Sequence, residues 1–189
     1  MADLSFLHLA SAGKKTSTGH IVSNIRKHYP DAYYFLASDN ADDLSDIARE
    51  HKTDYMWYSK KLGYPSYKYD KLISWLERFK FACENCKTSH IMMVEDDVWI
   101  KKPITVIDEW EMSCHYVSHG NVIPQDVITQ IMLFSGKPPK TNYYGGGGGS
   151  IYKVDTFLNN YDRVTEWFKR TMTKFKVIMS LLDSWIVIW

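Results

Sequence analysis

The segment HIMMVEDDVWIKKP, residues 90–103, places three acidic residues directly behind an apolar run. Residues 90–95 read as a buried β-strand, so Glu95, Asp96 and Asp97 gather at its carboxyl end. Adjacent carboxylates repel one another, and each is costly to desolvate unless a cation or a hydrogen-bond donor lies beside it. The three acids therefore either spread into water at an ordinary strand end or mark a place that receives a positive group.

Strand-like and helical segments alternate before this acidic segment. The strands are expected at 4–10, 32–38, 54–59 and 90–95, and the helices at 20–29, 42–51 and 66–83. This alternation predicts a parallel α/β sheet with right-handed crossovers. Beyond residue 104 the pattern is mixed, with a strand expected near 115–118, a loop at 136–141, a glycine run and then helices. No linker divides the chain, so a single domain over 1–189 is expected.

Composition excludes several classes of protein. The chain has 189 residues, of which 45% are hydrophobic and 15% aromatic, as in a folded globular domain. A formal net charge of +1 does not suit a nucleic-acid binder. No apolar run reaches the roughly 20 residues of a membrane span. No signal-peptide pattern is present at the amino terminus, so a cytoplasmic location is expected. The apolar final stretch, VIMSLLDSWIVIW, suggests either excision from a longer polypeptide or docking of this end against the core.

The three cysteines, Cys83, Cys86 and Cys114, cannot all pair with one another. A secreted disulfide scaffold is therefore not indicated. The CENC segment at 83–86 has the spacing of a redox pair or of half a zinc site, but no second such pair follows it. Buried free thiols are the favoured interpretation.

Polar residues follow three of the predicted strands. They are Ser11 with Lys14 and Lys15, Ser38 with Asp39, and the acids 95–97. Ligands of open α/β sheets bind at the carboxyl ends of the strands, so these groups are expected to meet at one edge. A strand-end acidic triplet there can hold Mg²⁺ or Mn²⁺, supply a general acid or base, or simply solvate a loop.

The segment MVEDDVWIKKP resembles the EDD form of the DxD motif of the GT-A glycosyltransferases, which use nucleotide-sugar donors. The chlorella-virus capsid-glycan enzymes are the nearest resemblance, which implies a viral protein of the host cytoplasm. The resemblance implies a GT-A domain with a mixed, mainly parallel sheet flanked by helices. Its nucleotide-binding half would cover about 1–103, and its acceptor-side half about 104–189. It also implies that Asp97 ligates Mn²⁺ or Mg²⁺, that Glu95 bonds a metal-bound water or the ribose, and that Asp96 lies beside the nucleoside.

Other positions acquire roles through the same resemblance. YDKL, residues 69–72, is similar to a family helix whose basic residue contacts the nucleotide-sugar donor. The resemblance therefore implies that Lys71 contacts the donor sugar or its diphosphate. A lysine that simply faces solvent is an equally good interpretation. Asp39 would contact the base or ribose, although an aspartate after a strand also initiates helices. Ser11 and the backbone around Ala10 would line the nucleoside slot.

The second unusual stretch is YYGGGGGSIYKVDTF, residues 143–157. Five consecutive glycines are costly in conformational entropy. The run lacks the GK[ST] ending of a phosphate loop, so a Walker motif is rejected. A flexible linker remains an alternative. The resemblance favours a glycine-rich strand whose backbone approaches the donor sugar and the acceptor, with Gly146 and Gly147 closest.

LLDSW, residues 181–185, resembles the segment that carries the catalytic base in certain inverting members. Asp183 would then deprotonate the acceptor hydroxyl, with apolar neighbours raising its pKa. In a retaining enzyme this role disappears. The last histidine is His119, so the late histidine of some metal sites is absent.

The sequence thus predicts a hexosyl- or pentosyltransferase that moves sugar from a UDP-sugar to a glycan or glycoprotein. Aromatic residues in predicted loops and at strand ends would stack on sugar rings, with Tyr64, Tyr67, Trp99 and Tyr143 as examples, whereas most other aromatic residues are expected in the core. One rival is a metal-dependent nucleotidyltransferase or sugar-nucleotide pyrophosphorylase, because SAGKKTSTG at 11–19 weakly imitates the basic glycine loop of those enzymes. The other rival is a non-catalytic carbohydrate-binding module. Further domains of the same polypeptide are also potential partners.

Overall fold

The computed structural model describes residues 4–38, 42–57, 69–109, 112–113, 125, 128–129, 132–133, 136 and 148–175. The strands are β1 (Leu4–Ala10), β2 (Tyr34–Ser38), β3 (Asp54–Met56), β4 (His90–Val94), β5 (Met112–Ser113) and β6 (Ile151–Lys153). The helices are α1 (Lys15–His28), α2 (Ser45–His51), α3 (Tyr69–Asn85) and α5 (Val154–Phe175).

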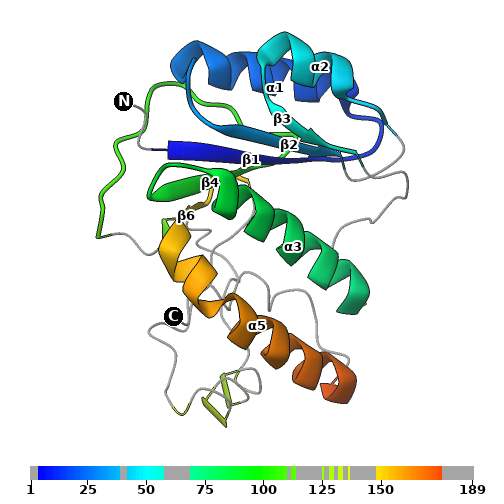
Figure 1. Ribbon diagram of the computed structural model, residues 1–189, viewed down its shortest axis with the longest axis vertical. Helices are drawn as coiled ribbons and strands as arrows, with labels where there is room; N and C mark the ends of the chain where they lie inside the picture. Colours follow the sequence, from blue (N-terminus) through cyan, green and yellow to red (C-terminus); the bar gives the residue numbers. More distant parts are fainter. Residues whose placement is uncertain are drawn as a thin grey trace.

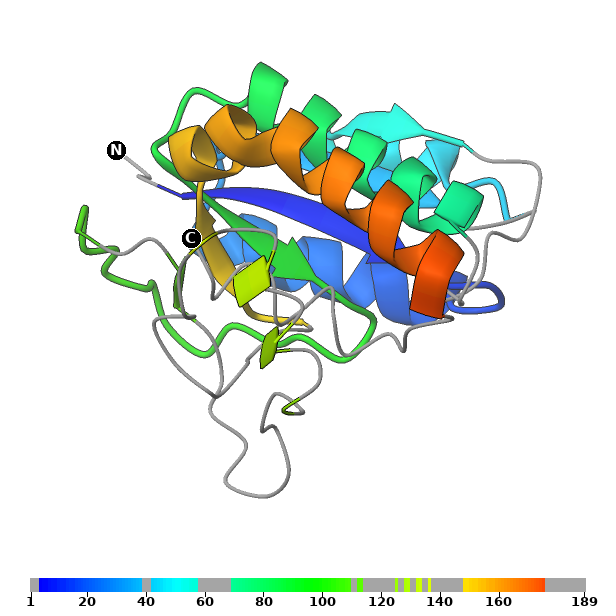
Figure 2. The same cartoon turned by 90° about the horizontal axis from the view of Figure 1, so that it is seen from below.

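These strands form one mixed sheet in the order β3-β2-β1-β4-β6-β5 across the described residues. The pairs β1–β2, β1–β4 and β2–β3 are parallel, whereas β6 runs antiparallel to both β4 and β5. Figure 1 shows α1 and α2 on one face of the sheet and α3 and α5 on the other, and Figure 2 shows the same layers from below. The predicted α/β domain with a mixed, mainly parallel sheet flanked by helices is confirmed.

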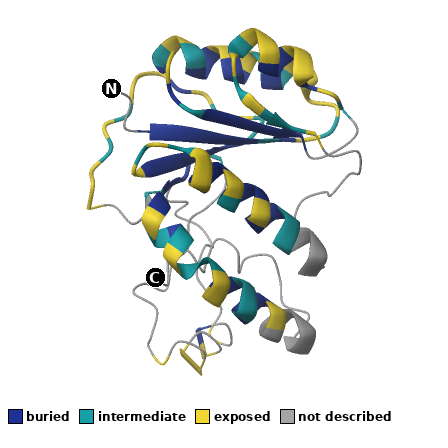
Figure 3. Cartoon of the chain, in the orientation of Figure 1, coloured by how far each residue is buried: buried dark blue, intermediate teal, exposed yellow. Residues whose placement is uncertain are grey.

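Alternating side chains of the strands supply both halves of the core. In β1, Leu4 and Phe6 pack with residues of α1 and α2, whereas Leu7 packs with residues of α3 and α5. Both faces are apolar because helices cover both sides, as expected for parallel strands. Figure 3 shows the consequence: the central strands are buried, and exposed residues lie on the outward sides of the helices.

The α3–α5 layer is joined by aromatic side chains. The rings of Phe79 and Phe157 meet edge to face with centroids 4.4 Å apart, and Phe79 also meets Tyr152 of β6 at 5.2 Å. The helix expected at 66–83 is present as α3, and its side chains Leu76 and Phe79 are buried. Cys83 and Cys86 are free thiols, with Cys83 buried and Cys86 partly buried, in accord with the favoured interpretation.

Some sequence expectations concern other parts of the chain. The strand expected near 115–118 lies outside the described residues, and so does the end of the predicted 54–59 strand beyond Trp57. β6 was not predicted from the sequence pattern, because three residues are too few to show a period. No helix within the described ranges is long and apolar enough to cross a bilayer.

Candidate functional site

The acidic triplet lies in a tight turn, residues 95–98, directly after β4, and this segment is called the acid turn. The Val98 amide donates a hydrogen bond to the Glu95 carbonyl oxygen at 3.1 Å, with Asp96 and Asp97 at the two central positions. The turn directs the three side chains to different surroundings: Glu95 and Asp96 are partly buried, and Asp97 is exposed. Three consecutive acids are therefore tolerated because they do not share one environment.

Asp96 joins the turn to β1 and α1. One carboxylate oxygen accepts a hydrogen bond from the Ser11 backbone amide at 3.0 Å, and the other accepts a longer one from the Thr18 hydroxyl at 3.4 Å. The Nε2 atom of His8 lies 3.6 Å from the same carboxylate. The predicted meeting of Ser11 with the acids at one sheet edge is thus confirmed.

Asp96 remains ionised at neutral pH. Burial raises the pKa of this carboxyl group, but the His8 ring and the Ser11 amide and hydroxyl outweigh burial and hold the pKa below its usual range. A carboxylate that accepts hydrogen bonds in a partly buried place favours its charged form. The Asp96 carboxylate thus fastens the acid turn to the loop after β1.

His8 occupies the centre of this network and is fully buried. Its Nδ1 atom shares a hydrogen bond of 2.8 Å with the Tyr34 hydroxyl, whereas its Nε2 atom has no hydrogen-bond partner. Burial lowers the pKa of the imidazole more than neighbouring Asp96 raises it, so the ring is neutral at pH 7. Sequence reasoning missed His8, although a histidine inside the apolar strand LSFLHLA is a visible signal.

Glu95 lies on the opposite side of the turn, against the end of the glycine run. Burial raises the pKa of its carboxyl group, the Gly148 backbone amide partly offsets this by donating a hydrogen bond, and the two neighbouring aspartates raise the pKa further. A Cβ atom at Gly148 would lie 2.5 Å from a methyl carbon of Val98 and 3.0 Å from Cβ of Glu95. Only glycine permits this close approach.

Backbone pairing holds the glycine run beside the acid turn. The Gly149 amide donates to the Met93 carbonyl oxygen, and the Met93 amide donates to the Ser150 carbonyl oxygen, both at 2.8 Å. Gly149 has a φ of +90°, in the region that favours glycine. The described end of the run, Gly148 and Gly149, therefore continues with Ser150 as an extension of the β4–β6 pairing and is not a linker. Sequence reasoning chose Gly146 and Gly147 and missed Gly148, because nothing in a run of identical residues singles out one member.

Asp97 differs from its two neighbours. Its side chain is exposed, and no hydrogen bond joins it to another residue that the structure describes. Carboxylate oxygens are the ligands that Mg²⁺ and Mn²⁺ prefer. Within the described parts of the chain, no three His, Cys, Asp or Glu side chains are grouped to hold a metal. A cation at this turn would therefore need further oxygen ligands from a bound molecule.

The loop after β1 also lies at this carboxyl end of the sheet. Ala10 is buried, whereas Ser11 is exposed with its amide bound to Asp96. The Lys15 ammonium, at the start of α1, lies 2.8 Å from a carboxylate oxygen of Asp46 in α2, so this lysine is paired with α2. Ser38 ends β2 in register with Ala10, as the predicted common edge requires.

For the remaining predicted site residues, the structure does not describe the side chains. Asp39, Gly146, Gly147 and Asp183 lie outside the described residues. Lys71 lies in the first turn of α3, and its side chain is not described. Of the aromatic residues expected to stack on sugars, Trp99 is 60% exposed, and Tyr64, Tyr67 and Tyr143 lie outside the described residues.

Comparison with known proteins gives a fold and no sequence family. No family model matches the sequence, and no curated protein matches it. A crystal structure of the galactosyltransferase LgtC with donor and acceptor sugar analogues is similar with a TM-score of 0.57, at 13% identity, over 96% of this chain and 70% of LgtC. An active-site mutant of LgtC matches with a TM-score of 0.54, at 12% identity, over the same shares of the two chains. The chain has the GT-A fold of these glycosyltransferases.

Proposed function

We propose that this protein is a metal-dependent glycosyltransferase that moves a sugar from a UDP-sugar to a hydroxyl group of a glycan or glycoprotein. One observation carries the proposal: an exposed carboxylate, Asp97, follows the central strand β4 at the edge where open α/β sheets bind ligands. Asp96 and Glu95 fasten the turn on both sides, so the position of Asp97 is preorganised.

The residues at the turn suit a hard divalent cation, either Mn²⁺ or Mg²⁺. Asp97 would hold it through a carboxylate oxygen, and the donor diphosphate and water would complete the ligand set, since the described residues offer no third protein ligand. Such a cation neutralises the charge that develops on the leaving diphosphate. The exposure of Asp97 supports this assignment, because a ligand shared with a nucleotide must be open to solvent.

The transfer itself requires few groups. The oxygen of the acceptor hydroxyl bonds to the anomeric carbon, the bond from that carbon to the diphosphate oxygen breaks, and UDP leaves. In an inverting reaction Asp183 would take the hydroxyl proton. Lys71 would neutralise the diphosphate, and Asp39 would contact the base or ribose. The backbone at Ala10 and Ser11, with the Asp96 side chain, would line the nucleoside slot.

The glycine run has a proposed part as well. Gly146 and Gly147 immediately precede Gly148, whose backbone already lies against Glu95. The two glycines would therefore pass close to the acid turn, where a chain without side chains leaves room for the donor sugar and the acceptor. The free thiols of Cys83 and Cys86 support placing the enzyme in the cytoplasm, since reducing compartments keep thiols unpaired.

The proposal is tested by thermal unfolding with UDP, in the presence of Mn²⁺ and in the presence of a chelator. A ligand that binds only the folded state raises the melting temperature by mass action, so UDP with Mn²⁺ should stabilise the protein more than UDP with chelator. Asp97→Asn should remove the Mn²⁺-dependent part. Asp162→Asn is the matched control, because Asp162 is an exposed aspartate on α5.

Product analysis separates this reaction from its rivals. Free UDP together with transferred sugar is the expected product. Release of pyrophosphate would contradict glycosyl transfer and indicate a nucleotidyltransferase. Sugar binding without any effect of Mn²⁺ or of Asp97→Asn would indicate a non-catalytic module.

A further inference from the structure

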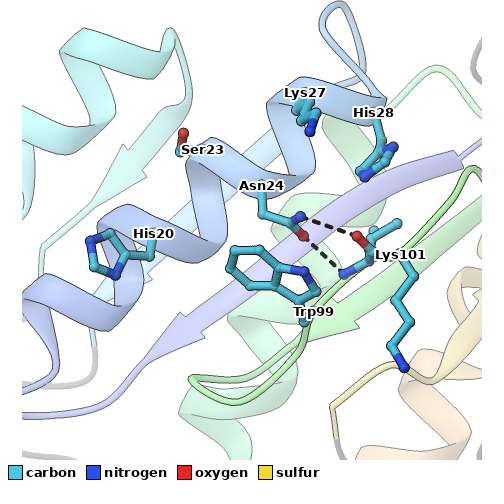
Figure 4. Close-up of a pocket in the computed structure, with 8 residues that line it drawn as sticks. His20, Ser23, Asn24, Lys27, His28, Trp99 and Lys101 are labelled. Atoms are coloured by element: carbon cyan, nitrogen blue, oxygen red, sulfur yellow. Dashed lines mark hydrogen bonds between the residues drawn. The ribbon is translucent and has the colours of Figure 1, made fainter.

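A groove of about 510 Å³ lies between α1 and the segment 99–101, and its lining does not include Asp96 or the residues that contact it. Its lining comes from α1 and from the segment after the acid turn (Figure 4). The lining residues are His20, Ser23, Asn24, Lys27, His28, Trp99, Ile100 and Lys101. A concave site of this size is within the range that holds a small ligand.

Two hydrogen bonds hold the segment 99–101 onto α1. The Asn24 side chain is buried; its amide nitrogen donates to the Ile100 carbonyl oxygen at 3.1 Å, and its oxygen accepts from the Ile100 amide at 2.9 Å. Ile100 is itself buried, so its neighbours Trp99 and Lys101 lie on the outer side. The backbone beneath the groove is therefore held in place at Ile100.

Trp99 gives the groove an apolar surface. Its side chain is 60% exposed, which is unusual for the largest aromatic residue, whose burial normally stabilises the fold. An exposed indole beside polar groups is typical of a binding surface. Its flat face matches the apolar face of a pyranose ring.

The described residues that line the groove carry charge of one sign. Lys27 and Lys101 are cations, His20 and His28 add ring nitrogens, and none of the lining residues that the structure describes is acidic. The helix dipole accounts for cationic residues in the last turn of α1, but not for His20 or Lys101. In Figure 4 the basic side chains are spread apart: His20 lies toward one end of α1, Lys27 and His28 lie toward the other, and the Lys101 side chain extends away from α1. This spread suits an extended ligand with several negative groups better than a single phosphate.

We propose that this groove binds an anionic oligosaccharide, with one sugar ring on Trp99 and with acidic groups near Lys27 and Lys101. The choice of a saccharide among polyanions rests on the proposed glycosyl transfer. The groove would then hold a charged segment of the acceptor, or of its product, outside the acid turn. A nucleic acid is less well suited, because the chain carries a formal net charge of only +1.

Calorimetric titration without nucleotide or metal tests the groove alone. The probes are a hyaluronan tetrasaccharide, which carries glucuronate carboxylates, and the neutral chitotetraose. The wild-type protein should bind the acidic probe more tightly than the neutral one, and binding should weaken as salt is added. Trp99→Ala should weaken binding of the acidic probe by about tenfold, and Lys27→Gln combined with Lys101→Gln by a similar factor.

Matched variants control for exposure and charge. Trp57→Ala removes another exposed indole, and Lys87→Gln removes a lysine at the opposite end of β4. Neither should change binding of the acidic probe by more than about twofold. Because the altered groove residues are exposed, circular dichroism and melting curves should match those of the wild-type protein.

Three results would overturn the inference. They are equal binding of the acidic probe by Trp99→Ala and wild-type protein, no binding of either saccharide, and stronger binding to an oligothymidine or to vesicles of anionic phospholipid. Stabilisation by UDP and Mn²⁺ is measured separately in the same variants. Absence of that stabilisation in the wild-type protein, with intact saccharide binding, would contradict the glycosyltransferase proposal and leave the groove assignment standing.

Discussion

The three consecutive acidic residues of the acid turn have different contacts and therefore different roles. Asp96 is bound to Ser11 and lies near Thr18, Glu95 is bound to Gly148, and Asp97 is exposed. Two of the acids thus hold the turn in place while the third is open to a ligand. The chemical difference between them arises from surroundings and not from residue type.

Replacing Asp96 should cost stability, whereas replacing Asp97 should not. Asp96→Ala removes a charged acceptor from the Ser11 amide, and hydrogen bonds to charged groups contribute about 1.5–3 kcal/mol each. Asp97→Ala removes only an exposed side chain and should change the free energy of unfolding by less than about 0.5 kcal/mol. Urea unfolding at pH 7 measures both. Equal losses from the two variants would contradict the division of tasks.

His8 should make the protein less stable in mild acid. Its folded-state pKa is lowered by burial, so the unfolded chain takes up a proton first as the pH falls below about 6.5, the ordinary pKa of histidine. The free energy of unfolding should therefore fall between about pH 7 and pH 5 in the wild-type protein. The His8→Gln variant lacks the imidazole that takes up this proton, so its free energy of unfolding should decrease less over that interval.

Urea unfolding at pH 7 and at pH 5.5 measures the decrease in the free energy of unfolding for the wild-type protein and for His8→Gln. His20→Gln is the control for the loss of a histidine side chain, because His20 is exposed. The same decrease in His8→Gln as in the wild-type protein would show that other groups cause the acid sensitivity.

At the scale of elements, β6 brings the glycine run to the acid turn. Because β6 is antiparallel to β4, the residues that precede β6 lie beside the carboxyl end of β4. The register pairs Met92 with Ile151, and the hydrogen bonds of Met93 extend this pairing toward the turn. The short strand β6 thus places Gly148 against Glu95.

Gly148→Ala should be destabilising. Its new methyl group would lie 2.5 Å from Val98 and 3.0 Å from Glu95, and overpacking of this kind costs about 1–3 kcal/mol. The double variant Gly148→Ala with Val98→Ala should recover part of the loss, because it removes the closer contact. Thermal and urea unfolding measure the changes.

A second glycine is the matched control. Gly19 lies within α1, and a Cβ atom there would meet Ile47 at an ordinary 3.7 Å. Gly19→Ala should therefore stabilise the protein by about 0.5–1 kcal/mol through the helical preference of alanine. Similar effects of the two alanine substitutions would refute the close approach at Gly148.

At the scale of the whole molecule, β1 is the centre of the sheet. It is hydrogen-bonded to β2 on one side and to β4 on the other, and its residues are almost entirely buried. β3, in contrast, is an edge strand among the described strands and is partly exposed. Local opening is rarest where backbone hydrogen bonds and apolar contacts are most buried.

Hydrogen–deuterium exchange should follow this order. Amides of 4–10 and 90–94 should exchange more slowly than amides of 54–56 by at least about tenfold, since opening the central strands requires near-global unfolding. Mass spectrometry of peptides from the exchanged protein measures the rates. Faster exchange in 4–10 than in 54–56 would contradict the strand order.

Local patterns predicted much of this architecture. Apolar runs and helical spacing identified β1, β4 and the helix α3, because hydrophobic periodicity is a property of neighbouring residues. The alternation of strands and helices predicted the parallel half of the sheet. Ser11 and the acids could be assigned to one edge, since the carboxyl ends of parallel strands meet there.

The sequence alone therefore determines which elements form and which end of the sheet is polar. The direction of each acid, the burial of His8 and the choice of Gly148 depend on contacts between distant segments: Ser11 and Asp96, for example, are 85 positions apart. Such contacts follow from strand register and helix packing, which only the folded chain establishes. Asp96 and Asp97 are chemically identical as residues, and folding gives one of them a partner and leaves the other open to solvent.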